Sequence, residues 1–372
     1  MTITIPASIR AAFERTDHPF YMWEELWKTP AALQSILTEP NKETIRQAAN
    51  SMLATDLVHL VGCGTSYFSS IAGMYAFHQF SAMRAQAHNA FEFSAYPSVG
   101  LGGTTVIATS HTGTTSAVLD SVALAKREGA FTIAITDVDD SALASAVGRV
   151  IEGGGGREKQ LPKTRSYVSS LLKTYLLAAA VAEQQGRDVA DLADRLADAP
   201  ATAQTVLDEN HELTRIIAED VATTAQVYLF GGGPHVASAA EGTLKLQETV
   251  QVRAFGFELE EGMHGPWVTM QPSDLVIVFA VRGPSFEKAK RFVQAISKLG
   301  VKLWVLSDDP DGVPEATYRT RLPNVPEVTS PLFATLPLYE FAYQLAILRG
   351  IRPDVMRLTE EAYLTARLQL PR

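Results

Sequence analysis

The stretch "VHLVGCGTS" (58–66) recurs in altered form as "VYLFGGGPH" (227–235), 169 positions further along the chain. Each copy begins with a short apolar run typical of a buried strand and ends in a glycine-rich turn. Arg84-Ala85 and Arg253-Ala254 keep the offset of 169, and "VIATSHTG" (106–113) matches "VIVFAVRG" (276–283) at 170. A shared offset at three places indicates two repeats of one unit, although unrelated α/β units also share the strand-then-glycine pattern.

Short apolar segments alternate with longer amphipathic ones along the chain. This pattern predicts an α/β protein with two mainly parallel sheets, each flanked by helices in a three-layer arrangement. The six expected strands cover residues 57–62, 104–109, 131–137, 226–231, 275–281 and 302–308. Helices are expected at 117–129 and 285–300, both closed by a glycine, and at 163–186 and 201–222.

The repeat divides the chain into a helical lead-in (1–45), a first domain (46–190), a second domain (205–350) and a tail (351–372). The segment "EGGGGRE" (152–158) has the composition of a linker. It lies inside the first domain and before a strong helix, so we expect a mobile loop near a site.

Composition narrows the classes of partner. The 372 residues carry a net charge of −9 without a Lys/Arg run, which argues against nucleic-acid binding. The single cysteine, Cys63, excludes an intramolecular disulfide and a cysteine-rich zinc site and suits a reducing compartment. A signal peptide and a run of 18 apolar residues are both missing from the sequence, so we expect a cytoplasmic protein without a membrane partner.

Two hydroxyl-rich turns follow expected strands of the first repeat, "GCGTS" (62–66) and "SHTGTTS" (110–116). In parallel sheets, ligands bind beyond the carboxyl ends of the strands, where helix N-termini present N–H groups. Glycine permits close approach of the backbone, and Ser and Thr hydroxyls donate to phosphate oxygens. The turns therefore favour a phosphate monoester, while the alternative is that Ser and Thr only cap helices.

The second repeat supplies a different chemistry in "AAEGTLKLQETV" (239–250). Glu241, Lys245 and Glu248 are spaced to share one helical face. Such spacing usually means a solvated, salt-bridged stripe, but here the helix follows Gly231-Gly232-Gly233 at an expected strand end, where a carboxylate can serve as a general base. His264 in "ELEEGMHGP" (258–266) is equally compatible with a structural turn and a catalytic role.

Nucleotide and cofactor motifs are weak or missing. The sequence lacks a Walker pattern, and "VGCGTSYFSS" lacks the third glycine of a dinucleotide fingerprint. We expect neither a cofactor nor a metal.

In order and spacing, "GCGTS", "SHTGTT", "EGTLKLQE" and "MHGP" resemble the motifs of the sugar isomerase (SIS) domain family. The resemblance extends from "HPFYMWEELWKTPAAL" (18–33) to the final helix and implies two tandem SIS domains. It is greatest to the isomerase half of glutamine–fructose-6-phosphate amidotransferase and to stand-alone fructosamine-6-phosphate deglycases.

The resemblance implies a role for each matching residue. Glu248 would be the base that moves a proton between C1 and C2, Lys245 would support it, and His264 would help to open the sugar ring in a neighbouring subunit's site, which implies a homodimer. The expected residues for binding the sugar phosphate are Cys63, Gly64, Thr65, Ser66, Ser110, His111, Thr112, Thr115, Leu161, Thr164 and Glu361.

The chain departs from the family in three places. His111 stands where the family usually has a glutamine or similar residue. The amidotransferase begins with a glutaminase domain whose first mature residue is cysteine; this sequence starts Met1-Thr2, so we expect no hydrolysis of glutamine. The family's tail lysine, which forms an imine with the ketose, has no counterpart after Lys302; Glu360 and Glu361 lie near its place.

These expectations point to an enzyme acting on an amino-sugar or fructosamine 6-phosphate, by aldose–ketose isomerisation with deamination or deglycation. Loss of the tail lysine favours a substrate that already carries nitrogen. The alternatives are an isomerase that uses free ammonia, a non-catalytic sugar-phosphate sensor and a structural α/β protein without a ligand.

Overall fold

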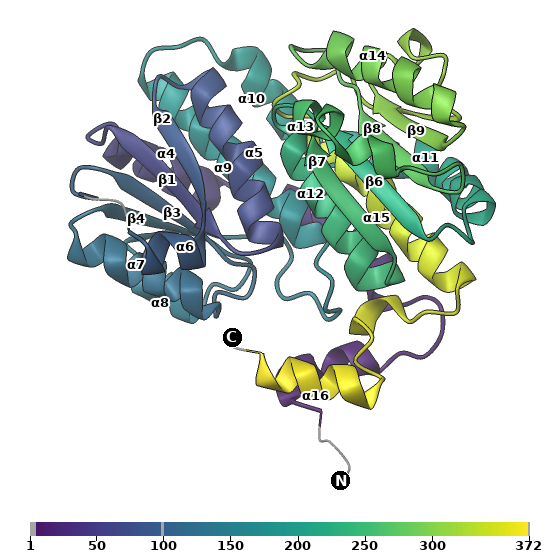
Figure 1. The fold of residues 1–372 in the computed structure, drawn as a ribbon. Coiled ribbons are helices and arrows are strands. Elements are labelled where there is room, and N and C mark those ends of the chain that lie inside the picture. Colours follow the sequence, from purple (N-terminus) through teal and green to yellow (C-terminus); the bar gives the residue numbers. More distant parts are fainter. Residues whose placement is uncertain (1–4, 98–99, 371–372) are drawn as a thin grey trace. The chain divides into compact units, whose positions relative to one another are not determined.

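The computed structural model describes residues 5–97 and 100–370, which form two compact units. The N-terminal unit comprises residues 28–157 and 165–202. The C-terminal unit comprises the described residues up to 27, the segment 158–164 and the chain from 203 onward. Both units are three-layer α/β structures (Figure 1).

The N-terminal unit is built on a five-stranded sheet of order β2-β1-β3-β4-β5, in which every pair of neighbours is parallel. One face carries α4, α5 and α9, and the other carries α6, α7 and α8 around a core that includes Val106, Val118 and Leu143. The strands are β1 (Leu57–Gly62), β2 (Arg84–Asn89), β3 (Thr105–Thr109), β4 (Phe131–Ile135) and β5 (Arg149–Ile151). The helices are α3 (Thr29–Ile36), α4 (Glu39–Met52), α5 (Thr65–Phe80), α6 (Ala90–Ala95), α7 (Ser116–Arg127), α8 (Ala142–Ala146), α9 (Arg165–Gln184) and α10 (Ala190–Ala197).

The C-terminal unit repeats this topology with a parallel sheet of order β10-β9-β8-β6-β7. Its strands are β6 (Gln226–Gly231), β7 (Arg253–Glu258), β8 (Leu275–Phe279), β9 (Lys302–Ser307) and β10 (Tyr318–Arg321). Its helices include α2 (Tyr21–Trp27), α12 (His235–Lys245), α13 (Leu259–Met263), α14 (Phe286–Ile296), α15 (Pro331–Leu348) and α16 (Glu361–Gln369). Helix α11 (Ala199–Asp220) continues from one unit into the other.

The same strand order in both sheets confirms the duplication that the sequence offset predicted. Arg84-Ala85 and Arg253-Ala254, which keep the offset of 169, are the first two residues of β2 and β7. The expected α/β fold with two parallel sheets is confirmed. All six expected strands are present, and α7 and α14 are followed by the left-handed glycines Gly129 and Gly300.

Sequence patterns missed β2, β5, β7 and β10, which are the edge strands of the two sheets. Edge strands are short or half-exposed, so they lack the continuous apolar run of a central parallel strand. The expected strand at 131–137 ends at Ile135, because Thr136 and Asp137 leave the sheet: the Thr136 hydroxyl donates to the backbone carbonyl of His111, and Asp137 accepts from Lys173. Among the described residues, no helix is long and apolar enough to span a membrane.

Candidate functional site

The sheet of the N-terminal unit places both hydroxyl-rich turns side by side. Strands β1 and β3 are hydrogen-bonded neighbours, and the chain leaves β1 for β2 on one side and returns to β3 on the other. Such a change of direction opens a crevice at the carboxyl ends of the strands, where α/β proteins bind ligands. The turns after Gly62 and Thr109 both lie at this edge of the sheet.

The first turn is shaped by glycine. A Cβ on Gly62 would lie 2.6 Å from the carbonyl carbon of Ser66, and Gly64 has a φ of +53°, which favours glycine. The backbone N–H of Ser66 donates to the carbonyl of Cys63 at 3.2 Å, and α5 begins at Thr65. Burial raises the pKa of the Cys63 thiol, opposed by the N–H groups of Ala90 and Phe91, so a neutral thiol lies at the strand end.

The second turn gathers its hydroxyl groups by mutual hydrogen bonds. Ser110 Oγ lies 3.1 Å from Thr115 Oγ1, and Thr112 Oγ1 lies 2.8 Å from Thr114 Oγ1. Thr115 occupies the N-cap position of α7 without accepting a capping bond through its side chain, and the N-cap of α5 is Gly64. Neither α5 nor α7 is therefore capped by the side chain of a serine or threonine at its N-cap position.

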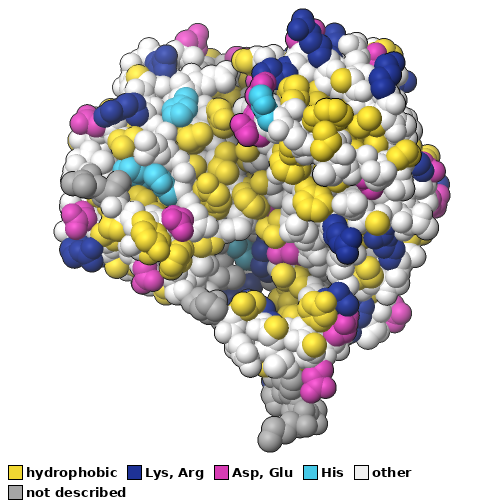
Figure 2. Space-filling model, viewed as in Figure 1, with side chains coloured by type: hydrophobic (Ala, Val, Ile, Leu, Met, Phe, Trp, Pro, Cys, Tyr) yellow, Lys and Arg dark blue, Asp and Glu magenta, His cyan; other side chains and the backbone are white. Residues whose placement is uncertain are grey.

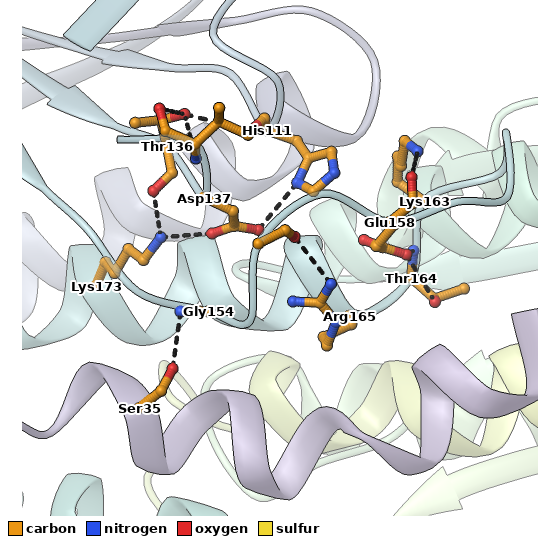
Figure 3. Close-up of polar contacts among 12 residues, drawn as sticks. Ser35, His111, Thr136, Asp137, Gly154, Glu158, Lys163, Thr164, Arg165 and Lys173 are labelled. Carbon is orange, nitrogen blue, oxygen red and sulfur yellow. Dashed lines mark hydrogen bonds and ion pairs between the residues drawn. The ribbon is translucent and has the colours of Figure 1, made fainter. Parts of the chain in front are cut away.

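The His111 side chain continues the second turn into a buried charged group (Figure 3). His111 Nδ1 lies 2.9 Å from Asp137 Oδ2, and Lys173 Nζ lies 2.6 Å from Asp137 Oδ1. Lys173 also donates to the carbonyl of Thr136 at 2.7 Å. Burial lowers the pKa of Lys173, and the contact with Asp137 opposes this effect. Sequence reasoning identified His111 but missed Asp137 and Lys173, which lie 26 and 62 positions further on.

The tetraglycine loop packs against this group. Gly154 has a φ of +95°, and a Cβ there would lie 2.5 Å from Asp137 Oδ1. Its N–H donates to Ser35 Oγ on α3 at 3.0 Å (Figure 3). The glycine-rich loop therefore lies against Asp137, the side chain that contacts His111, within the N-terminal unit.

In the C-terminal unit, the acid–lysine–acid pattern is buried. Lys245 Nζ lies 2.6 Å from Glu248 Oε2 and 3.5 Å from Glu241 Oε1, and Tyr339 donates to Glu241 Oε1 at 3.0 Å. The side chains of Glu241 and Lys245 are buried and that of Glu248 is 15% exposed, so the solvated stripe is wrong. Burial would lower the pKa of Lys245, but the surrounding carboxylates outweigh it and raise that pKa.

A change of helix type positions Glu248. Helix α12 ends at Lys245 and continues as a π-helical turn, Leu246–Val250, which stops at Gln251 with a φ of +59°. Such π turns often accompany functional residues in helices. Here the turn holds the Glu248 carboxylate against the lysine.

The segment 158–164 brings in a carboxylate that sequence reasoning missed. Glu158 Oε2 accepts from the backbone N–H of Thr164 at 3.1 Å and from its hydroxyl at 3.3 Å, and it contacts Gln160. Glu158 is also one of the acids that raise the pKa of Lys245. Glu158 is the last residue of the glycine-rich segment "EGGGGRE" (152–158), and this was the only signal for it in the sequence.

The remaining candidates of this unit are spread more widely. The Leu161 N–H donates to the carbonyl of Asp354 at 2.9 Å, which ties the segment to the tail. His264 is 68% exposed, and its Nε2 lies 3.1 Å from Glu260 rather than beside Lys245 or Glu248. Glu361 is exposed at the start of α16.

In the second repeat, a carboxylate of the chain itself contacts the turn that corresponds to "SHTGTTS". Ser285, which aligns with Thr115 at the offset of 170, donates to Glu327 Oε1 at 2.9 Å. A Cβ on Gly283 would lie 2.1 Å from Glu327 Oε2, so the carboxylate lies directly on this turn. Burial, and secondarily the nearby Asp308, raises the pKa of Glu327.

Two parallel sheets with the same strand order, each with helices on both faces, define a duplicated three-layer α/β protein. The model of the SIS domain matches residues 56–180 and 221–349. The chain therefore belongs to the SIS domain family, with two copies of the domain.

Curated relatives match nearly the whole chain. It is 27% identical over 355 residues to the glutamine–fructose-6-phosphate aminotransferase (isomerizing) of Gloeobacter violaceus, covering 92% of this chain and 58% of that protein. Identity to the corresponding Thermococcus kodakarensis protein is 28% over 349 residues, with coverage of 92% and 58%. The chain thus spans less than six tenths of these relatives.

Solved structures share the fold. The C-terminal domain of glucosamine-fructose-6-phosphate aminotransferase from Francisella tularensis superposes with a TM-score of 0.83 at 20% identity, covering 91% of this chain and 98% of that one. Glucosamine-6-phosphate deaminase from Thermotoga maritima superposes with a TM-score of 0.71 at 23% identity, covering 90% of this chain and 96% of that one. Tagatose-6-phosphate ketose/aldose isomerase from Escherichia coli superposes with a TM-score of 0.77 at 17% identity, covering 92% of this chain and 96% of that one.

Proposed function

We propose that this protein is an enzyme that acts on an amino-sugar or fructosamine 6-phosphate and transfers a proton between C1 and C2. The observation that carries the proposal is the contact between the buried Lys245, at the end of α12, and Glu248 on the π turn that follows it in the second SIS domain. A carboxylate that a neighbouring lysine holds in place can act as a general base, provided that it reaches the substrate carbon. Glu248 is the least buried member of the acid–lysine–acid group and is therefore our candidate base.

The phosphate of the substrate is assigned to the crevice of the N-terminal unit. Ser66, Ser110, Thr112 and Thr115 provide hydroxyl groups there, and α5 and α7 begin at this edge. In the second repeat the corresponding turn already binds the Glu327 carboxylate. This difference supports one sugar-phosphate site per chain.

The reaction would proceed by enolisation. Glu248 removes a proton from one of the two carbons and returns it to the other, while the carbonyl or imine moves in the opposite direction. In deglycation, fructosamine 6-phosphate and water give glucose 6-phosphate and an amine. In deamination, glucosamine 6-phosphate and water give fructose 6-phosphate and ammonia. Both substrates carry nitrogen, which agrees with the absence of lysine from the described residues after Lys302.

His264 is assigned to the site of a second copy of the chain. It is exposed, and apolar side chains surround its loop, with Trp267 40% exposed and Val268 64% exposed. Figure 2 shows apolar side chains gathered over α13 and α14. Exposed apolar patches of this kind often mark protein interfaces, which supports the homodimer implied by the family resemblance.

The test is the Glu248→Gln variant, which keeps the shape of the side chain and removes the base. We expect it to bind glucose 6-phosphate as the wild type does and to lose exchange of the C1 or C2 proton in heavy water, measured by NMR. A screen of aminated hexose 6-phosphates, read by released amine, then distinguishes deglycase from deaminase. Unchanged exchange in the variant would reject Glu248 as the base.

Two alternatives give different results in the same assays. An isomerase that uses free ammonia would form glucosamine 6-phosphate from fructose 6-phosphate and ammonium. A sugar-phosphate sensor would bind the hexose phosphate and show no proton exchange with any substrate of the screen.

A further inference from the structure

Three side chains form a continuous polar chain from the middle of the N-terminal unit to its phosphate-binding turn (Figure 3). Lys173 projects from α9 to Asp137 after β4, and Asp137 contacts His111 after β3. All three are buried, with exposed side-chain fractions of 0%, 1% and 8%.

The lysine determines the direction of the hydrogen bond to the histidine. Its ammonium donates to Asp137 Oδ1 at 2.6 Å, which keeps the aspartate an acceptor. Asp137 Oδ2 must then accept from His111, so the proton of the imidazole lies on Nδ1. A hydrogen bond of this kind fixes both the tautomer and the orientation of the ring.

The backbone of the same residue is also fixed. The carbonyl of His111 accepts from Thr136 Oγ1 at 3.2 Å and from the N–H of Asp137 at 3.3 Å. The end of β4 therefore holds His111 by its main chain and its side chain together.

Stability alone gives little reason for this arrangement. The desolvation of two buried charges offsets most of their attraction, and an apolar pair of similar volume is often as stable. Gly154 must also adopt a left-handed conformation against Asp137 to leave room for the pair. Through Asp137, the buried pair contacts one residue of the binding turn, His111. This contact indicates that the role of the pair is to orient His111.

We propose that Asp137 and Lys173 are positioning residues that fix the tautomer and orientation of His111, and through His111 set the affinity of the turn for a phosphate monoester. This inference rests on the proposed function only in assigning a phosphate to the turn. The family resemblance, with a glutamine-like residue in place of His111, does not require either partner.

A double-mutant cycle tests the coupling, with glucose 6-phosphate as the probe in isothermal titration calorimetry. We expect Asp137→Asn to weaken binding about tenfold in the wild-type background and less than twofold when His111 is already Gln, because the effect passes through the imidazole. Equal losses in both backgrounds would show that Asp137 acts on the unit as a whole and would overturn the proposal.

The double variant Asp137→Asn with Lys173→Met controls for folding, because it leaves no unpaired buried charge. We expect its affinity to match that of Asp137→Asn alone. Affinity restored to the wild-type level by the second substitution would contradict the proposal.

A second measurement does not need the phosphate. Long-range ¹H–¹⁵N NMR of the histidine rings, assigned by the signal lost in His111→Gln, should show His111 protonated at Nδ1 in the wild type and a mixture of tautomers in Asp137→Asn. An unchanged tautomer would overturn the inference even if the sugar phosphate binds. If the wild type shows the expected tautomer but does not bind glucose 6-phosphate, the assignment of the phosphate to this turn fails, and the affinity part of the inference fails with it.

Discussion

Lys245 lies between two carboxylates of its own helical segment and donates to Glu248 at 2.6 Å, while Glu241 is 3.5 Å away. One cation thus compensates two buried acids, with a third, Glu158, close enough to raise the pKa of the lysine. Lys245 therefore bears both on the position of the candidate base and on the stability of the C-terminal unit.

Replacing Lys245 with Met should therefore affect both properties. Glu248 and Glu241 lose the neighbouring ammonium group, and breaking a buried ion pair in this way costs about 3–5 kcal/mol. We expect a lower urea midpoint and loss of C1/C2 proton exchange. Glu241→Gln is the matched control, because it keeps the Lys245–Glu248 contact and should retain exchange. Full activity and stability in Lys245→Met would contradict this account.

The proposed exchange of His264 between subunits predicts complementation. The exposed side chain can be replaced by Asn without loss of thermal stability, yet His264→Asn and Glu248→Gln should each abolish turnover. When equal amounts of the two variants are unfolded and refolded together, half of the dimers are mixed and each contains one complete site. Activity should return to about one quarter of the wild-type level. No recovery, despite mixed dimers shown by mass spectrometry, would place His264 in the site of its own subunit or outside the site.

The tail contributes to stability through Asp354. This buried carboxylate accepts from the N–H groups of Tyr21 at 2.8 Å and Met22 at 2.9 Å, at the start of α2. Asp354→Ala leaves both donors unsatisfied, and we expect a loss of about 2–3 kcal/mol in urea unfolding. Asp311→Ala removes an exposed ion pair to Arg321 and should change stability by less than about 1 kcal/mol. Equal effects of the two variants would contradict the assignment.

Glu327 predicts a pH dependence of stability. Burial raises its folded-state pKa above the ordinary value of 4.5, so the folded protein binds more protons than the unfolded chain between the two pKa values. Stability from this residue is complete below the unfolded pKa and is lost as the pH rises through the folded pKa. Glu327→Gln does not titrate, so its melting temperature relative to wild type should increase between pH 4 and pH 7.5. Exposed Glu287→Gln is the control and should show little change. A difference in melting temperature between Glu327→Gln and wild type that stays constant over this pH range would show that the pKa of Glu327 is not raised.

Much of the fold could be predicted from local patterns. Central strands such as Leu57–Gly62 and Leu275–Phe279 are buried on both faces, so they are continuous apolar runs that periodicity detects. The duplication was visible because both copies keep a strand followed by glycine, where β1 and β6 lie close to the next helix. Edge strands such as Arg149–Ile151 escaped detection because they are short and partly exposed to solvent, so they lack a continuous apolar run.

The sequence by itself determined the two repeats, the hydroxyl-rich turns at neighbouring strand ends, and the spacing of Glu241, Lys245 and Glu248. These features depend on residues close in sequence or on a repeated period. Only the tertiary structure decided that the acid–lysine–acid pattern is buried rather than solvated. It also decided that Asp137 and Lys173 hold His111, and that Glu327 contacts the turn after β8. Burial and charge pairing depend on contacts between segments that are distant in sequence. The spacing of residues within one segment carries no information about which distant segment will pack against it.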